Sequence, residues 1–371
     1  MSLDVLVNLL WLVPGVVGGS EESTTDALRA VAEVTTPDRV RIRLAVLAPF
    51  LSAHPDLAEH FECDVLDLDG RDKPRRVLAE QTWLASRTRA ARVDVVHHAG
   101  GGVPLRHPGR TGLTVHDLQP LDLPHHFHRT KRAYIRAMAG RSARAAAVVT
   151  VPSRFTRDRV VATLGVPPGK VLVVPWSVRP PQVHDEPFPL PPWLGDDPFL
   201  LYPAITYPHK NHRVLLDAFA LVARTHPDLR LVLTGGVSSA EGEVSERIAR
   251  PDLDGRVLRT GRVPAAQLEA LFAAARAVVV PSAYEGFGLP VLEAMVRGVP
   301  VVAADAGSLP EVARPEDLVP SDDVEAWAAA VAAVVEEPAD RRAERIRAGH
   351  DRAARFDGRR TATALLDAYG R

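Results

Sequence analysis

Residues 277–312 read AVVVPSAYEGFGLPVLEAMVRGVPVVAADAGSLPEV, and this stretch decides the fold. Residues 278–280 are an apolar run without polar alternation, which is typical of a strand inside a parallel sheet. Pro290 stands where a first helical residue is expected, and Gly298 stands just past the last, so a helix is predicted between them. A second apolar strand, residues 299–303, follows. The stretch therefore predicts a βαβ unit and an α/β fold.

Two carboxylates of this unit suggest a binding site. Glu285 lies in the loop after the first strand, and Glu293 lies eight positions later in the helix. In an open α/β sheet, ligands bind at the carboxyl ends of the strands. The loop glycines allow a close approach to the backbone, and the helix start offers amides to an anion. An ordinary loop glutamate and an exposed helix glutamate are the alternative. The predicted donor-side residues are Glu285, Gly286, Phe287, Gly288, Leu289 and Glu293.

The spacing of these two glutamates resembles the E-x7-E motif of retaining GT-B glycosyltransferases of family 4, the glycosyl transferases group 1. The resemblance implies an α/β GT-B fold, with two doubly wound Rossmann-like domains facing across a cleft. It implies that a hexose of mannose or glucose type moves from a nucleoside diphosphate sugar to an acceptor hydroxyl, with the anomeric configuration retained. It implies no cofactor and no metal.

The same resemblance extends to other parts of the chain. His116, in VHDLQPLDLP, is similar to a family histidine beside the transferred sugar, and Lys210, in PHKN, to a lysine that neutralises the diphosphate. With Glu285 these are the expected catalytic residues. The further donor contacts that the resemblance implies are Gly18 and Gly19 in a first glycine loop, Gly235 in a second, and the backbone of Val263 at the nucleobase.

Alternatives remain for these residues. A lone histidine is more often structural, and His97 and His98 also fall at a strand end. Lys210 could be a surface lysine. The family often carries an arginine about six residues before this lysine, whereas this chain has Ala204. His209 or Arg213 could supply the missing cation.

Length and composition bound the function further. The 371 residues favour two domains. With 45 Lys and Arg against 46 Asp and Glu, the net charge of −1 argues against a nucleic-acid partner. The single cysteine, Cys63, excludes an internal disulfide framework. The N-terminus lacks a basic region before its apolar stretch, and no apolar run reaches 18 residues, so we expect a cytoplasmic protein.

Proline content predicts the domain organisation. Residues 179–198 contain seven prolines, which no regular element tolerates, so this segment is the expected interdomain linker. It separates an acceptor-side domain, residues 1–178, from a nucleotide-sugar-binding domain, residues 199–355. The last segment, residues 356–371, is expected to form a helix that packs back on the first domain, by analogy with the family.

The helix predicted over residues 125–147 holds six basic residues between 129 and 144. A solvated face explains them most simply. The alternative is a surface for an anionic acceptor or for peripheral contact with the inner face of a membrane. Two Asp-x-Asp spacings, at 67–69 and 252–254, are poorly placed for a metal.

Two rival functions remain open. One is a sugar-nucleotide 2-epimerase of the same architecture, and the other is a catalytically silent sugar-nucleotide-binding module. The PHKN wording resembles that of members that use GDP-mannose. The sequence does not specify the acceptor, which could be a glycan, a lipid-linked molecule or a small molecule.

Overall fold

A computed structural model describes residues 2–100, 102–107, 109–126, 129–180, 189–192, 194–195 and 197–371, without the side chains of His126 and Lys131. These residues divide into two compact units. Unit 1 comprises residues 1–177 and 356–371, and unit 2 comprises residues 178–355. The sequence predicted a first domain that ends at residue 178 and a second that spans residues 199–355. Much of the predicted linker, at 181–188, 193 and 196, lies outside the described residues.

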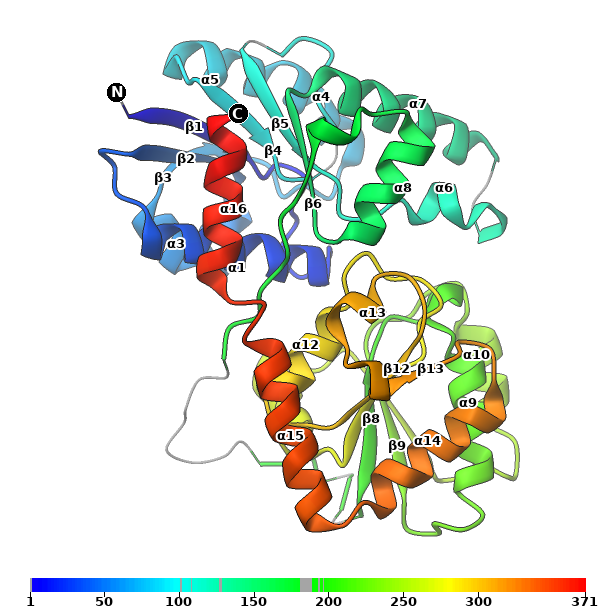
Figure 1. The fold of residues 1–371 in the computed structure, drawn as a ribbon. Helices are drawn as coiled ribbons and strands as arrows, with labels where there is room; N and C mark the ends of the chain where they lie inside the picture. Colours follow the sequence, from blue (N-terminus) through cyan, green and yellow to red (C-terminus); the bar gives the residue numbers. More distant parts are fainter. Residues whose placement is uncertain are drawn as a thin grey trace. The chain divides into compact units, whose positions relative to one another are not determined.

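Unit 1 is built on a parallel sheet of seven strands among the described residues, in the order β3-β2-β1-β4-β5-β6-β7 (Figure 1). The chain adds strands in one direction from β1 and then in the other from β4, so the order switches between β1 and β4. The strands are β1 (Leu3–Asn8), β2 (Val40–Leu47), β3 (Glu62–Leu66), β4 (Val95–His98), β5 (Arg110–Thr114), β6 (Val148–Val151) and β7 (Val171–Val173).

Helices cover the unit 1 sheet. The main ones are α1 (Gly19–Val34), α2 (Ala48–Ala53), α3 (Pro55–His60), α4 (Lys73–Gln81), α5 (Trp83–Ala91), α7 (Arg129–Ala145), α8 (Arg154–Leu164) and α16 (Gly358–Gly370), with α6 (Gln119–Asp122) and the short 3₁₀ turns η1 (Pro124–His126) and η2 (Pro168–Lys170). The last helix, α16, belongs to unit 1 and lies alongside α1.

Alternating residues of β1 separate two cores. Val5 and Val7 pack with α1, α2, α3 and α16, whereas Leu6 packs on the other face with Leu84 of α5. The apolar run of residues 5–13 predicts one strand of that length, whereas the observed β1 spans only Leu3–Asn8. It ends at Asn8, whose side-chain carbonyl accepts a hydrogen bond from the Leu10 amide at 3.1 Å and turns the chain. The apolar residues after Asn8 are buried without continuing the strand.

Unit 2 repeats the plan with a parallel sheet ordered β10-β9-β8-β11-β12-β13 in the described residues. Its strands are β8 (Phe199–Pro203), β9 (Arg230–Thr234), β10 (Val257–Gly261), β11 (Ala277–Val280), β12 (Val301–Ala304) and β13 (Leu318–Val319). Its helices are α9 (His212–Val222), α10 (Glu241–Ile248), α11 (Ala265–Ala274), α12 (Leu289–Val296), α13 (Leu309–Val312), α14 (Val324–Glu336) and α15 (Ala339–Ala353), with 3₁₀ turns η3 (Pro208–Lys210) and η4 (Pro315–Asp317).

The predicted βαβ unit is present as β11, α12 and β12. The strands pair in parallel, with Val278 beside Val301. Gly298 follows the helix with a left-handed φ of 68°, as expected for a residue just past a helix end. No helix of the described residues is long and apolar enough to cross a membrane.

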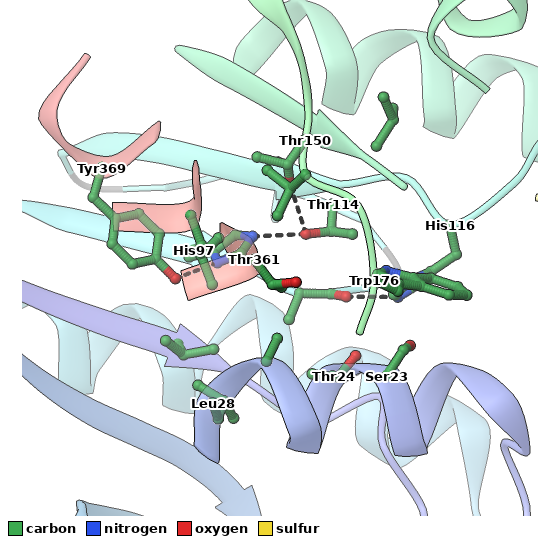
Figure 2. A pocket seen from close by; sticks show the side chains of 16 residues that line it. Ser23, Thr24, Leu28, His97, Thr114, His116, Thr150, Trp176, Thr361 and Tyr369 are labelled. Carbon is green, nitrogen blue, oxygen red and sulfur yellow. Dashed lines mark hydrogen bonds between the residues drawn. The ribbon is translucent and has the colours of Figure 1, made fainter. Parts of the chain in front are cut away.

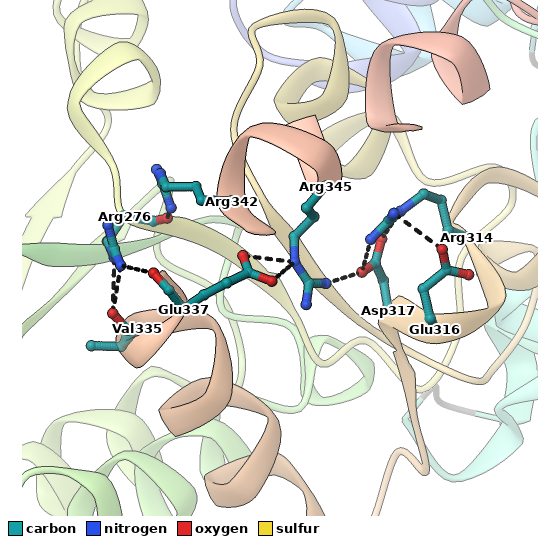
Figure 3. Close-up of polar contacts among 8 residues, drawn as sticks. All are labelled: Arg276, Arg314, Glu316, Asp317, Val335, Glu337, Arg342 and Arg345. Carbon is teal, nitrogen blue, oxygen red and sulfur yellow. Dashed lines mark hydrogen bonds and ion pairs between the residues drawn. The ribbon is translucent and has the colours of Figure 1, made fainter. Parts of the chain in front are cut away.

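A chain of ion pairs fixes the closing helices of unit 2 to the edge of its sheet (Figure 3). Arg345 of α15 bonds to Glu337, at 3.0 Å, and to Asp317 beside β13. Asp317 is buried and also accepts from Arg314 at 2.6 Å. Because each buried charge has an opposite partner, the network orients α15 without leaving an unpaired ion.

Candidate functional site

The strand order of unit 2 reverses between β8 and β11, and ligands of doubly wound sheets bind at such a switch point. The loop after β8 carries Lys210, and the loop after β11 carries Glu285. The topology therefore brings together two residues that are far apart in the sequence. The Lys210 Nζ donates to Glu285 Oε1 at 2.6 Å, with the two side chains only 18% and 12% exposed.

A buried tyrosine holds the lysine loop in place. The Tyr202 hydroxyl, at the end of β8, donates to the Lys210 carbonyl at 2.7 Å and lies 3.0 Å from the Ser282 hydroxyl. Burial, and then the Glu285 carboxylate, raise the pKa of Tyr202 well above its ordinary value, so the phenol stays protonated. Tyr202 therefore joins the loop after β8, which carries Lys210, to the loop after β11, which carries Ser282.

Asn211 makes a second link between these loops. Its φ of 55° is left-handed, a conformation that asparagine tolerates better than most residues. Its side-chain amide donates to the carbonyls of Pro281 at 3.2 Å and Ser321 at 2.6 Å. These two hydrogen bonds fix Asn211, and with it the backbone next to Lys210.

Two glycines with left-handed backbones shape the surroundings of Glu285 and the start of α12. Gly307 has a φ of 60°, and a Cβ there would lie 2.8 Å from the Glu285 amide nitrogen. Gly288 is the N-cap of α12, with a φ of 113°. The start of α12 has no capping side chain. Pro290 has no N–H, and the Val291 amide donates to the Gly288 carbonyl at 3.1 Å, so the Leu289 amide can meet an anion at this end.

The remaining predicted residues of this loop and helix differ in exposure. Phe287 is 2% exposed and Leu289 is 9% exposed, so their side chains belong to the core and only their backbones could face a ligand. Gly286 and Glu293 are half-buried. Glu293 lies one turn into α12.

The loop after β9 lies beside the end of β8. A Cβ on Gly235 would lie 2.4 Å from the Ala204 carbonyl oxygen, so only glycine fits there. Arg259 donates to the Gly235 carbonyl at 2.9 Å, and the Arg262 side chain lies against Gly236. Val263 follows Arg262 and is half-buried.

Two residues near Lys210, in the loop after β8 and the helix that follows it, were proposed as substitutes for the missing arginine. Neither supplies an unpaired cation there. Arg213 is 68% exposed and ion-pairs with Asp217 at 3.8 Å and Glu243 at 3.7 Å. His209 is buried and stacks on Tyr207, with ring centroids 5.6 Å apart. Arg259 and Arg262, which the sequence analysis did not single out, lie instead against Gly235 and Gly236 in the loop after β9.

The other predicted residues belong to unit 1. Gly18 is the N-cap of α1 with a φ of 79°, and the exposed Gly19 is the first residue of that helix. His116 follows β5, and its ring contacts two indoles, with centroids 5.3 Å from Trp11 and 5.4 Å from Trp176. The loop between β1 and α1 starts at the switch point of this sheet.

Hydrogen bonding defines the tautomer of His116. Its Nε2 lies 2.8 Å from the Ala99 carbonyl, which can only accept, so this nitrogen carries the proton. Burial lowers the pKa of His116 to about 4, and the ring is therefore neutral at pH 7. Its Nδ1 is then an acceptor, and it is buried without a partner among the described residues.

The two neighbouring histidines have structural partners. His98 Nδ1 lies 3.1 Å from the side-chain nitrogen Nδ2 of Asn8. His97 lies 2.7 Å from the Tyr369 hydroxyl through Nδ1 and 2.8 Å from the Thr114 hydroxyl through Nε2. Burial lowers the pKa of both histidines to about 3, so they are neutral. They sit at a strand end as expected, but inside the core.

Several of these residues could not be found from sequence. Tyr369 contacts His97 across 272 positions, and no local pattern marks such a pair. Trp176 could have been found, because it closely follows β7 at the same sheet edge as His116. Within the described part of the chain, no three His, Cys, Asp or Glu side chains group in a way that could hold a metal ion.

Comparison with known proteins identifies the family. A family model described as Glycosyltransferase Family 4 matches residues 17–180, and one described as Glycosyl transferases group 1 matches residues 186–352. Together they account for most of both units. The chain belongs to the family 4-like glycosyltransferases of the GT-B fold.

Curated relatives of this glycosyltransferase are also transferases. The O-antigen chain mannosyltransferase B of Escherichia coli is 28% identical over 286 residues, which cover 74% of each chain. The D-inositol 3-phosphate glycosyltransferase of Saccharomonospora viridis is 38% identical over 176 residues, 44% of this chain and 40% of the relative.

Solved structures share its fold at low identity. Anabaena HepE, solved in complex with UDP and glucose, has a TM-score of 0.71 and 19% identity, covering 98% of both chains. Sucrose-phosphate synthase from Thermosynechococcus elongatus has a TM-score of 0.75 and 19% identity, covering 99% of this chain and 98% of the other. The enzyme is thus an α/β glycosyltransferase with two parallel sheets.

Proposed function

We propose that this glycosyltransferase moves a hexose from a nucleoside diphosphate sugar to an acceptor hydroxyl with retention of the anomeric configuration. The observation that carries the proposal is the Lys210–Glu285 pair at the switch point of unit 2. A cation for a diphosphate and a carboxylate for sugar hydroxyls lie in contact there. The start of α12, which has no side-chain cap, follows Glu285 in the same loop.

Each residue has a separate role in this proposal. Lys210 and the Leu289 amide neutralise the charge that develops on the diphosphate as it leaves. Glu285 accepts hydrogen bonds from hydroxyls of the transferred sugar, and Glu293 accepts them from the ribose. His116 of unit 1 acts beside the sugar as a neutral group. The donor contacts implied for Gly18, Gly19, Gly235 and Val263 remain predictions.

The reaction balances without an added reagent. The bond between the anomeric carbon and the diphosphate oxygen breaks, and the anomeric carbon bonds to the acceptor oxygen. The proton of the acceptor hydroxyl leaves with the nucleoside diphosphate. The negative charge is met by Lys210 and the helix start, so we propose that no metal takes part. GDP-mannose is the proposed donor, supported by the similarity to a mannosyltransferase.

Peripheral contact with a membrane through α7 stays a prediction. Arg141 takes no part in such a surface, because it donates to the carbonyls of Val103 and Pro104. That arginine fixes the loop after β4. Arg129, Arg136 and Arg144 are exposed, as on an ordinary solvated helix.

The test is incubation of the enzyme with GDP-mannose or UDP-glucose and a panel of hydroxyl acceptors. We expect release of the nucleoside diphosphate together with a new glycoside whose anomeric configuration, read by NMR, matches the donor. Conversion of the donor to its 2-epimer would instead indicate an epimerase. Binding of the nucleotide sugar with neither reaction would indicate a silent binding module.

A further inference from the structure

A short helix of unit 2, α13, begins beside Glu285. Ser308, the residue just before this helix, holds the Glu285 backbone. Its hydroxyl donates to the Glu285 carbonyl at 3.0 Å, and its amide donates to the same oxygen at 3.3 Å. Ser308 is fully buried, so these two bonds fix the carbonyl without competition from bulk water.

Two apolar side chains of α13 lie against the start of α12. A Cβ on Gly288, the N-cap of α12, would lie 2.8 Å from Leu309 Cδ2 and 4.0 Å from Val312 Cγ2. Leu309 and Val312 are fully buried. Because close-packed groups transmit displacement to their neighbours, a shift of α13 would move the N-cap of α12 together with the Glu285 backbone.

An arginine from a later helix holds the end of α13. Arg352, in the last turn of α15, donates through Nε to the Val312 carbonyl at 3.0 Å and through Nη2 to the Glu311 carbonyl at 2.8 Å. Carbonyls at the end of a helix have no amide of the same helix to accept from. Because the guanidinium is a rigid planar fork, its two bonds fix both the position and the direction of α13.

The helix that carries Arg352 is itself held at two further points. Near the middle of α15, Arg345 takes part in the chain of ion pairs at the sheet edge (Figure 3). Near its end, a Cβ on the buried Gly349 would lie 3.5 Å from Met295 Cγ, so α15 packs closely on α12. Arg352 therefore extends to α13 from a helix whose position in unit 2 is fixed.

We propose that Arg352 is a positioning residue for the transfer reaction and acts on Glu285 through α13 and Ser308. The inference rests on the proposed function, which gives Glu285 and the Leu289 amide their roles. Arg352 touches neither the sugar nor the diphosphate in this account. Without its two bonds, α13 and the Glu285 backbone lose a common support, and a misplacement of about 1 Å at a reacting group slows a reaction by up to about a hundredfold.

The kinetics of Arg352→Ala test the proposal. We expect kcat for transfer to fall at least about tenfold, because a small misplacement of Glu285 is costly. Arg352→Lys, which keeps the charge and can donate to one of the carbonyls, should show a smaller loss of the same kind. Arg347→Ala, at an exposed position of α15, is the matched control and should stay within about twofold, as surface substitutions do. Rates are compared at a temperature at which melting curves show every variant to be folded.

Two readouts separate positioning from a general loss of stability. If Arg352 acts through Ser308, the kcat of the double variant Arg352→Ala with Ser308→Ala should lie near that of the slower single variant, because effects along one path do not multiply. Hydrogen exchange of the ligand-free protein is the second readout. Amides of residues 285–292 should exchange faster in Arg352→Ala than in Arg347→Ala, whereas those of residues 230–234, in β9, should exchange alike.

The outcomes separate this inference from the proposed function. Equal kcat values for Arg352→Ala and Arg347→Ala in an active enzyme would overturn the inference, as would multiplied effects in the double variant. Exchange at residues 285–292 that is the same in both arginine variants would also refute it, whether or not the enzyme is active. An unmodified enzyme that neither uses nor binds a nucleotide sugar would instead refute the proposed function.

Discussion

The ammonium of Lys210 and the carboxylate of Glu285 are both largely withdrawn from water and lie 2.6 Å apart. A pair of this kind is costly to break, because one charge is left without its partner. The lysine therefore has two roles in our account. It stabilises the loops of the switch point before the donor arrives, and it meets the diphosphate afterwards.

Lys210→Ala is expected to lower turnover strongly and also to lower the free energy of unfolding by about 1–3 kcal/mol, because Glu285 loses its cation. Transfer kinetics and urea denaturation measure the two effects. Arg213→Ala, which removes an exposed cation from the helix that follows, serves as the control. It should change neither the turnover nor the free energy of unfolding. Full activity in Lys210→Ala would require another cation at the diphosphate.

Gly307 controls the position of Glu285 through the backbone. Its φ of 60° and the 2.8 Å approach of a Cβ to the Glu285 amide predict that Gly307→Ala is strained. We expect a loss of about 1–3 kcal/mol in unfolding free energy and a lower kcat. Gly242→Ala, in α10 with open space around it, should be neutral or slightly stabilising. Equal melting temperatures for the two variants would contradict this role.

At the scale of elements, residues 277–312 predicted their strand–helix–strand unit because each boundary carries its own signal. Pro290 and Gly298 mark the helix locally, and both strands are continuous apolar runs. The first strand was predicted too long, since apolar residues after Asn8 are buried in a turn. Hydrophobic residues indicate burial but not secondary structure. The turn that ends β1 depends on the hydrogen bond from the Leu10 amide to the Asn8 side chain.

The packing of α16 on unit 1 depends on contacts that sequence alone does not disclose. Its Tyr369 bonds to His97 inside the core, and its Thr361 hydroxyl donates to the Pro175 carbonyl at 2.7 Å. Only the family resemblance suggested where this helix packs. A small cavity in unit 1 has α16 as one wall (Figure 2), so its lining also could not be predicted from local patterns.

The buried His97 predicts a dependence of stability on pH. Its pKa falls to about 3 in the folded protein, below the ordinary 6.5, so between pH 6.5 and 3 the unfolded chain binds the extra proton. The contribution of His97 to the free energy of unfolding should be constant above pH 6.5. Below pH 6.5 it should fall on acidification, by up to about 1.4 kcal/mol per pH unit. Urea denaturation from pH 7 to pH 4.5 measures the slope.

His97→Asn should be less stable than the unmodified protein at pH 7, because Tyr369 and Thr114 lose their partner, yet it should show a shallower slope below pH 6.5. Thr363→Ala, at an exposed position of α16 where the hydroxyl donates only to the Arg359 carbonyl, leaves the slope unaltered in this account. Identical slopes for the unmodified protein and His97→Asn would show that His97 is charged in the folded state.

At the scale of the whole molecule, each unit presents a different chemistry at the switch point or carboxyl edge of its sheet. Unit 2 has a lysine, carboxylates and a helix start, whereas the small cavity in unit 1 has neutral histidines, hydroxyls and apolar walls. The sequence predicted the residues of unit 2 because they are close together or match a motif. It could not show that His116 is neutral, since that depends on burial and on the Ala99 carbonyl.

Metal independence is a prediction about the complete reaction. If Lys210 and the Leu289 amide carry the charge of the leaving group, transfer should persist within about twofold in a large excess of chelator, since these groups act as the preorganised electrostatic partners. Initial rates with EDTA, and after adding magnesium or manganese back, measure this. A loss that either metal restores would contradict the assignment.

Calorimetric titration of GDP and UDP into the unmodified protein and into Glu293→Ala tests the central claim most directly. The account predicts that one nucleoside diphosphate binds, and that Glu293→Ala weakens its binding about tenfold or more, since hydrogen bonds to a charged group contribute about 1.5–3 kcal/mol. Arg213→Ala should bind as the unmodified protein does. Equal affinity in Glu293→Ala, or no binding of either nucleotide to the unmodified protein, would contradict a nucleotide-sugar site at the switch point of unit 2.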